Sequence, residues 1–227
     1  MDRQKLTETL QNSLSFWDKL TDNQKRMMTE QTRPVHYIKG ESVRSRLENC
    51  AGMILVRSGE LRVYIVSDDG REVTLYRLEP GEVCVLSAGC VLAAINFEVL
   101  IDAVEDSDIL LVSPAVFRQL TEENIYVKCF GYETSAARFS DVMWSMQQIL
   151  FFSADRRLAV FLSGEYEKNG CMVKMTQDQI ARYIGSAREV VSRMLKYFEQ
   201  EKLVRLFRGG LEILDPDGLE KLAGNEE

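Results

Sequence analysis

Residues 176–195 have the sequence TQDQIARYIGSAREVVSRML, and this stretch decides the fold of the C-terminal part of the chain. Ser or Thr followed three residues later by Glu or Gln is the pattern of a capping box, which starts a helix. The stretch contains two such pairs ten residues apart, Thr176 with Gln179 and Ser186 with Glu189. A glycine lies between them, as in the tight turn of a helix-turn-helix. The sequence therefore predicts two short helices joined by a glycine turn.

The two predicted helices divide their side chains between an inward apolar face and an outward polar face. The inward set is Ile180, Ala181, Ile184, Val191, Met194, Leu195 and Phe198. The outward set, near the start of the second helix, is Ala187, Arg188, Glu189, Ser192, Arg193 and Lys196. A recognition helix presents its N-terminal side chains to base edges in the major groove of DNA. We therefore predict that the outward set, together with Thr176, contacts DNA.

The chemistry of the outward side chains suits base reading. Arg188 and Arg193 can each bond O6 and N7 of guanine. Glu189 can accept a hydrogen bond from cytosine N4, and Lys196 can meet a phosphate. Two alternatives stay open, because an arginine on an exposed helix face is usually a solvated charge and Glu189 also fits the role of capping partner to Ser186.

Residues 203–214 follow the helix pair and read as a β-hairpin that turns at Arg208-Gly209-Gly210, which would form a wing beside the helices. Residues 153–214 hold eleven Lys or Arg against eight Asp or Glu, a local charge of +3 in a chain whose formal charge is -7. Phosphate binding requires a local basic face and not a basic protein. The acidic chain as a whole therefore does not exclude DNA as a partner.

Residues 125–150 carry side chains at the spacing of a coiled-coil seam, with steps of four and three in strict alternation. The seam residues are Ile125, Cys129, Tyr132, Ala136, Phe139, Met143, Met146 and Leu150. A helix of about 28 residues would be ~42 Å long, which is longer than a small β domain needs. We predict a helix over 123–152 that pairs with a second copy of the chain, and the alternative is a core helix lying on the β domain. Residues 151–155 indicate a hinge, at which Ser153 would cap the next helix.

The N-terminal half is rich in strand signals. The first thirty residues read as helix, up to a break at Arg33-Pro34. Short apolar and β-branched runs then occupy 35–38, 52–57, 61–66, 73–78, 97–103 and 109–112, separated by glycine and proline turns. The runs at 61–66 and 72–76 form a hairpin pattern with Asp-Gly at its turn. Regularly spaced strands predict a small antiparallel barrel or sandwich, and the whole chain is predicted to be α+β.

Composition excludes several classes of protein. The chain has 227 residues, of which 45% are hydrophobic and 28% charged, as in one or two ordinary globular domains. No apolar stretch approaches the ~18 residues of a membrane helix, and the polar N-terminus does not resemble a signal peptide. We expect a cytoplasmic protein whose five cysteines, with no C-x-x-C pair, are thiols. The single histidine, His36, and the absence of a Gly-rich phosphate loop or nucleophile-base pair argue against an enzyme, so no catalytic or metal residue is assigned.

The order of these parts resembles the CRP/FNR family of bacterial transcription regulators over nearly the whole chain. The strongest match is the stretch Ile180-Ala181-x-x-Ile184-Gly185-x-x-Arg188-Glu189-x-Val191-Ser192-Arg193-x-Leu195. The resemblance implies a double-stranded β-helix (β-roll) of the cyclic-nucleotide-binding type at 1–122 that senses an effector, a dimerisation helix at 123–152 and a winged helix-turn-helix at 153–227. It also implies a homodimer on a palindromic operator in double-stranded DNA, with RNA polymerase as a partner. Base reading would fall to Arg188, Glu189 and Arg193.

The effector region departs from the cyclic-nucleotide pattern of that family, in which an arginine followed by Ser or Thr holds the cyclic phosphate. The sequence has no Lys or Arg between Arg77 and Arg118. Desolvating a phosphate without a cation costs several kcal/mol, so we predict that cyclic AMP and cyclic GMP do not bind. No cysteine precedes Cys50, which argues against an iron–sulfur cluster. His36 as the sole histidine makes haem a weak candidate.

The predicted effector pocket consists of Glu82, Cys84, Ser87, Cys90, Asn96, Val142 and Met143. Cys84 and Cys90 either take part in redox, metal or small-molecule sensing or are small buried hydrophobes. The predicted function is a dimeric DNA-binding regulator controlled by an unidentified small-molecule or redox signal. The alternative is an effector-independent regulator with a vestigial β-roll.

Overall fold

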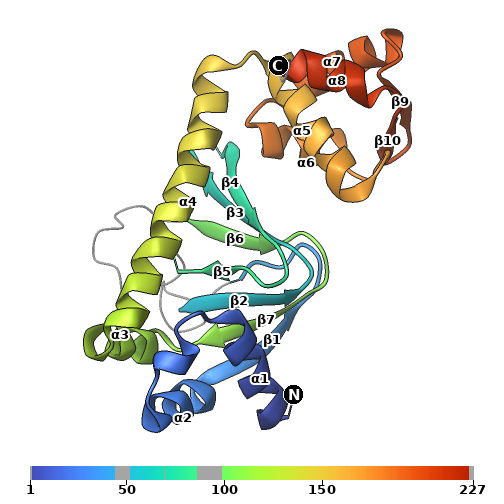
Figure 1. The fold of residues 1–227 in the computed structure, drawn as a ribbon. Coiled ribbons are helices and arrows are strands. Elements are labelled where there is room, and N and C mark those ends of the chain that lie inside the picture. Colours follow the sequence, from blue (N-terminus) through green and yellow to red (C-terminus); the bar gives the residue numbers. More distant parts are fainter. Residues whose placement is uncertain (1, 44–51, 69, 86–98, 225–227) are drawn as a thin grey trace. The chain divides into compact units, whose positions relative to one another are not determined.

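The computed structural model describes residues 2–43, 52–68, 70–85 and 99–224, which form two compact units. The first unit contains residues 1–65 and 75–142, and the second contains 66–74 and 143–227. Figure 1 shows the long helix α4 (Ile125–Phe151). Its residues up to Val142 belong to the first unit and those from Met143 onward belong to the second. Among the helices that the structure describes, none is long and apolar enough to cross a membrane.

Three helical segments occupy the N-terminus, where the sequence predicted helix over the first thirty residues. They are α1 (Arg3–Ser13), the 3-10 turn η1 (Trp17–Lys19) and α2 (Asp22–Glu30). A capping box starts α2, because the Thr21 hydroxyl accepts from the Gln24 backbone N–H at 3.3 Å and the Gln24 side chain accepts from the Thr21 N–H at 3.1 Å. These bonds satisfy backbone donors that a helix start leaves unpaired. The predicted helical region is therefore confirmed, and it consists of three segments.

The strands of the β-roll lie in two sheets. One sheet has the order β1 (Thr32–Tyr37), β7 (Ser107–Val112), β2 (Met53–Ser58) and β5 (Val83–Cys84). The other has the order β4 (Glu72–Leu78), β3 (Leu61–Val66) and β6 (Leu100–Ala103). The pairs β1–β7, β2–β7, β2–β5 and β3–β6 are antiparallel. Pro34 is tolerated because β1 is an edge strand. The predicted strands are confirmed within the described residues; positions 97 and 98 lie outside them.

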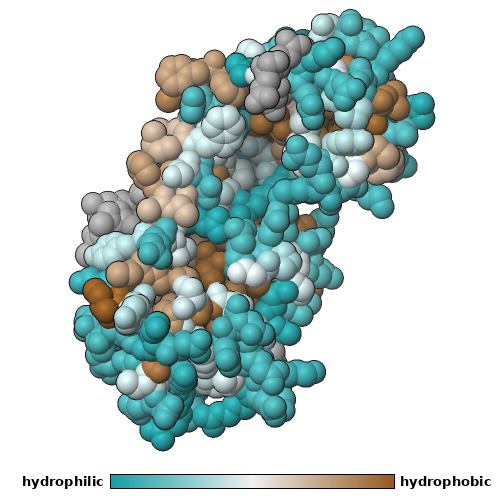
Figure 2. Space-filling view, viewed as in Figure 1, coloured by the Kyte–Doolittle hydropathy of each residue, from teal (hydrophilic) through white to brown (hydrophobic). Residues whose placement is uncertain are grey.

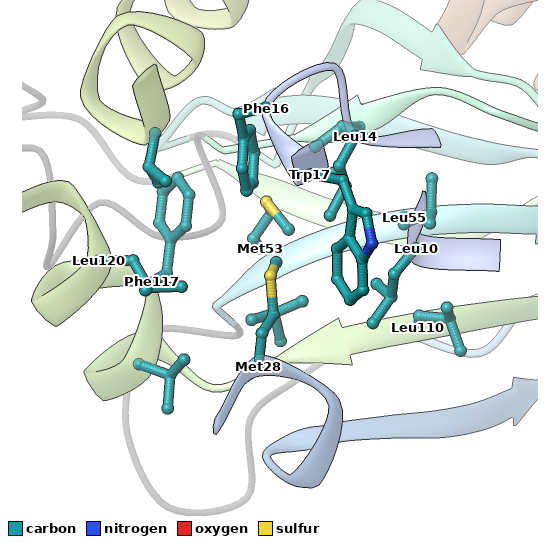
Figure 3. Close-up of a cluster of buried hydrophobic side chains, with 14 of the residues drawn as sticks. Leu10, Leu14, Phe16, Trp17, Met28, Met53, Leu55, Leu110, Phe117 and Leu120 are labelled. Carbon is teal, nitrogen blue, oxygen red and sulfur yellow. The ribbon is translucent and has the colours of Figure 1, made fainter. Parts of the chain in front are cut away.

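The first four residues of strand β2 are buried and alternate between two apolar cores. Met53 and Leu55 join the core under α1, η1 and α2, where Trp17 packs (Figure 3). Ile54 and Val56 point the other way, into a core shared with the second sheet. Successive side chains of a strand face opposite sides, which is why a continuous apolar run at this position reads as a strand and not as an exposed edge.

Helix α4 follows α3 (Pro114–Glu123) and has two distinct faces. Its inward face includes the buried Val127 and Gly131. All eight residues of the predicted seam are exposed in the single chain, with Ile125, Phe139 and Leu150 more than 60% exposed. Figure 2 shows apolar side chains gathered along this helix. Predicted and observed helix bounds agree closely, and the seam does not serve as the chain's own core.

The second unit contains the predicted helix-turn-helix and wing. Its elements are α5 (Ala154–Asn169), β8 (Met172–Val173), α6 (Gln177–Ile184), α7 (Arg188–Gln200), β9 (Val204–Phe207), β10 (Gly210–Ile213) and α8 (Pro216–Ala223). The strands form a sheet in the order β8-β10-β9. The predicted inward residues of α6 and α7 are buried in the core of this unit, and Met194 packs partly buried against it. The fold is thus a β-roll, a long helix and a winged helix-turn-helix, as predicted.

Candidate DNA-binding site and effector pocket

Helix α6 begins with the predicted capping box. The Thr176 hydroxyl accepts from the Gln179 backbone N–H at 3.2 Å, and the Gln179 side chain accepts from the Thr176 N–H at 2.8 Å. Thr176 is exposed but its hydroxyl is occupied by these bonds. In the structure Thr176 therefore has a defined role in starting α6, separate from its predicted contact with DNA.

The turn after α6 is built on Gly185, which has left-handed backbone angles of φ 60 and ψ 44. A residue with a Cβ is strained there. The Ser186 N–H donates to the Ala181 carbonyl at 2.9 Å, which closes the end of α6. The glycine turn is thus confirmed and positions the start of the next helix.

Helix α7 starts one residue later than predicted. Its N-cap is Ala187, which has no side-chain hydrogen bond to the helix. The predicted capping box of Ser186 with Glu189 is wrong, because Ser186 belongs to the glycine turn and Glu189 is at the second helical position instead of the third. The Glu189 carboxylate is therefore not used to cap α7.

The outward face of α7 carries the side chains that the sequence assigned to DNA. Ala187, Arg188, Glu189, Arg193 and Lys196 are exposed, while Ser192 is half-buried. Within the described ranges, none of the four charged side chains on this face forms an ion pair or a side-chain hydrogen bond.

Other arginines of the second unit do have partners. Arg182 pairs with Asp178 at 3.0 Å, and Arg205 pairs with Glu212 at 3.0 Å. The outward charges of α7 therefore differ from their neighbours in having no internal partner among the described residues. Such charges can meet an external ligand without first breaking an internal ion pair.

The wing lies against the C-terminal half of α7. Strands β9 and β10 pair antiparallel and turn at Arg208 and Gly209, as predicted. The Glu199 carboxylate of α7 accepts from the Leu206 backbone N–H at 2.9 Å. This bond ties the first strand of the wing to the helix that carries the outward charges.

The predicted effector residues fall into three groups. Cys84 belongs to β5 and is buried in the β-roll core, against which Val142 packs partly buried, while Glu82 directly precedes β5. Met143 is 46% exposed and belongs to the second unit. Ser87, Cys90 and Asn96 lie outside the described residues.

Helix α4 contributes a partly buried cation that the sequence reasoning missed. The Arg138 side chain is only 12% exposed; its Nη2 donates to Glu82 Oε1 at 2.9 Å and its Nη1 to Asp141 Oδ2 at 3.0 Å. The guanidinium lies 5.0 Å from the ring centroid of Tyr76. We call Arg138, Glu82, Asp141 and Tyr76 the Arg138 cluster. This cation lies outside the stretch between Arg77 and Arg118, which has no Lys or Arg, because it comes from α4.

The Arg138 cluster has a net charge of -1, from one guanidinium and two carboxylates. Burial acts to lower the pKa of Arg138, but its hydrogen bonds to Glu82 and Asp141 outweigh burial and raise the pKa. For Tyr76 the effect of burial has the opposite sign: it raises the pKa of the phenol far above its usual range, so the phenol stays neutral. Arg138 is thus charged and already occupied by the protein's own carboxylates.

The periodicity of α4 contains the signal that could have found Arg138. The buried Gly131 and the partly buried Arg138 are seven residues apart and share one helix face, away from the exposed seam. A lone charged residue on the inward face of an amphipathic helix predicts a buried ion pair. The identity of its partner required the fold.

The described cysteines are free thiols in unlike surroundings. Cys84 is fully buried with its sulfur 3.6 Å from the Tyr76 hydroxyl, while Cys129 and Cys171 are exposed. In the part of the chain that the structure describes, no three His, Cys, Asp or Glu side chains are grouped as metal ligands would be.

Comparison with known proteins identifies both halves of the chain. The model of the Crp-like helix-turn-helix domain matches residues 156–222, and that of the cyclic nucleotide-binding domain matches residues 34–124. A solved structure from Eubacterium rectale, described as a CRP/FNR-family transcriptional regulator, is 41% identical with a TM-score of 0.89, covering 94% of this chain and 99% of that one.

More distant proteins are similar to this chain in sequence or in fold. The transcriptional activator protein FnrA of Stutzerimonas stutzeri is 28% identical over 82% of this chain and 78% of its own length. FixK2 of Bradyrhizobium japonicum, at 19% identity and a TM-score of 0.66 over 84% of this chain and 96% of that one, shares the fold. The chain therefore belongs to the CRP/FNR family and is a transcription regulator with a helix-turn-helix DNA-binding domain.

Proposed function

We propose that the protein acts in the cytoplasm as a homodimer that binds a palindromic operator through the outward face of α7. The observation that carries this proposal is the set of exposed charges on that face without partners among the described residues, namely Arg188, Glu189, Arg193 and Lys196. Arginine can contact guanine in bidentate fashion, and a glutamate can accept from cytosine. RNA polymerase is the expected protein partner of the bound dimer.

The exposed seam of α4 supports the homodimer. A strict alternation of four and three is the pattern by which two helices pack knobs into holes. Tyr132, Phe139 and Leu150 are each at least 60% exposed in one chain, and large apolar side chains exposed in a contiguous stripe mark an interaction site. A second copy of α4 would cover them.

The Arg138 cluster supports an effector other than a cyclic nucleotide. Its guanidinium already bonds two carboxylates, and a cyclic phosphate would add a second negative charge beside a cluster of net charge -1. Like charges at close range disfavour one another, more so where water is excluded. Calorimetric titration with cyclic AMP and cyclic GMP tests this point, and micromolar or tighter binding of either would contradict it.

Selection of DNA from a random pool, followed by gel-shift competition, tests the proposed function. Arg193→Ala should cost about 1–3 kcal/mol on the selected operator and relax one base position, whereas Lys196→Ala should weaken all sequences alike. Arg193→Lys keeps the charge but loses the bidentate fork, so it should retain non-specific affinity and lose preference. Lys221→Ala, an exposed lysine on α8, is the matched control for Lys196→Ala. Unchanged preference in Arg193→Ala would refute the assignment of α7.

A further inference from the structure

Two adjacent arginines hold the connection between α4 and α5. Arg157, in the first turn of α5, donates from Nη1 to the carbonyls of Ile149 at 3.1 Å and Phe152 at 3.4 Å. The last four carbonyls of a helix have no partner within it, and a cation at that end also faces the negative end of the helix dipole. Arg157 therefore caps the C-terminus of α4 from the element that follows it.

Arg156 holds the same connection from its other side. Its guanidinium lies 3.8 Å from the ring centroid of Phe152, and its Nε donates to the Ala223 carbonyl at the end of α8 at 2.8 Å. The Phe152 ring in turn meets Trp144 edge-on, with centroids 6.0 Å apart. A chain of contacts therefore runs from the last turns of α4 through Arg156 to α8.

The residue after Ala223 has a backbone that fits this arrangement. Gly224 has a φ of +77, and a Cβ built on it would lie 2.6 Å from Arg156 Nη2. Both the left-handed backbone and the close guanidinium favour glycine at this position. A glycine after α8 thus leaves room for the Arg156 guanidinium beside the end of the helix.

These contacts join the proposed dimer seam to the DNA-binding elements. Met143, Met146 and Leu150 of the seam are exposed and belong to the same compact unit as α5, α6 and α7. Residues 149–157, which we call the elbow, are the covalent connection between the two. In the sequence residues 151–155 read as a hinge, but in the structure arginine contacts hold the elbow on both sides.

We propose that Arg156 and Arg157 are positioning residues that fix the elbow and thereby set the half-site spacing that the dimer accepts. The inference rests on the proposed function, since it requires two α7 helices on one operator. Moving two half-sites apart by one base pair shifts them by about 3.4 Å and rotates them by about 34°, given ~34–36 Å per helical turn. If the elbow is rigid, the two α7 helices cannot follow the shifted half-sites; if it is flexible, they can.

The test measures dissociation constants on operators whose half-sites are moved by one and two base pairs in each direction, and on an isolated half-site. In the wild type we expect one base pair of displacement to cost as much as a mismatched base pair, about tenfold or more in Kd. In the double variant Arg156→Ala/Arg157→Ala we expect a penalty below about threefold, with isolated half-site affinity unchanged. Lys221→Ala should keep the wild-type profile.

Two further variants guard against a simple loss of folding. Phe152→Leu keeps apolar volume but removes the ring under Arg156, so its spacing profile should flatten in part. Arg157→Lys keeps a cation at the end of α4 and should restore much of the wild-type profile relative to Arg157→Ala.

The outcomes separate the two proposals. A spacing profile in the arginine variants that equals the wild type, or a flat profile in the wild type, overturns the inference alone. An equal loss on the isolated half-site and on every spacing also overturns it, because the arginines would then only support the fold. Failure of the wild type to bind any selected DNA refutes the proposed function and takes the inference with it.

Discussion

The Arg138 cluster predicts an unusual order of stabilities among its variants. The guanidinium is the buried member, at 12% exposed, whereas the Glu82 and Asp141 side chains are 39% and 42% exposed. Water can therefore solvate either carboxylate if the cation is removed, but it cannot readily solvate the cation if the carboxylates are removed. Removing Arg138 should cost less stability than removing its two partners.

The magnitudes follow from the contacts. Glu82→Ala/Asp141→Ala leaves a buried charge without a counterion, which costs about 3–5 kcal/mol in proteins. Glu82→Ala alone keeps the ion pair of Arg138 Nη1 with Asp141 Oδ2 at 3.0 Å. It should therefore lower the free energy of unfolding by only about 1–2 kcal/mol, toward the lower end of the ~1.5–3 kcal/mol of a hydrogen bond to a charged group. Arg138→Met loses about 1 kcal/mol from the Tyr76 ring and regains about as much from sulfur on the same ring. Its net cost should be under about 2 kcal/mol.

Urea unfolding followed by tryptophan fluorescence measures this order. The chain has two tryptophans, and in a Trp144→Phe background the buried Trp17 reports on the first unit alone. Protein concentration must be equal throughout, because dimerisation adds to apparent stability. If Arg138→Met were as destabilising as the double carboxylate variant, the reasoning from burial would be refuted.

Three further predictions concern residues at the ends of helices α5, α6 and α7. Thr176→Ala should cost about 1 kcal/mol by removing the cap of α6, whereas Ser186→Ala should stay within about 0.5 kcal/mol; equal losses in chemical denaturation would restore the second capping box. Gly185→Ala should cost about 1–2 kcal/mol because of its left-handed backbone, and an unchanged unfolding midpoint would contradict that. The Ser153 hydroxyl holds the pKa of Asp155 below its ordinary value, so Asp155 stabilises the fold above its unfolded pKa and loses this contribution as pH falls through its lowered folded pKa. Ser153→Ala should raise that pKa in an NMR titration of the carboxyl carbon, and an unshifted titration would disprove the contact.

Interactions between residues close together in the sequence were sufficient to predict much of the structure of the second unit. The capping box at Thr176, the glycine turn and the inward faces of α6 and α7 depend on residues within one or two helical turns of each other. Such interactions are fixed by spacing, which a sequence displays directly. The same holds for the exposed seam of α4, whose steps of four and three put its side chains on one face.

Local signals also produced an error. Ser186 and Glu189 have the spacing of a capping box, but the hydrogen bond of the Ser186 N–H to Ala181 places Ser186 in the preceding turn. Ser186 thus fits two patterns, the end of a glycine turn and the start of a capping box. It adopts the turn because the left-handed Gly185 fixes the chain direction before the next helix begins.

Sequence by itself determined the order of elements and the helix face that is proposed to read DNA, because both depend on short-range periodicity, and the motif at 180–195 carried the resemblance to the family. Only the tertiary structure decided what the arginines do. Arg138 meets Glu82 from 56 residues away, and Arg156 meets the end of α8 from 67 residues away. The physical reason is that an ion pair or a carbonyl contact between distant segments depends on how whole elements pack, and no spacing along the chain encodes that distance.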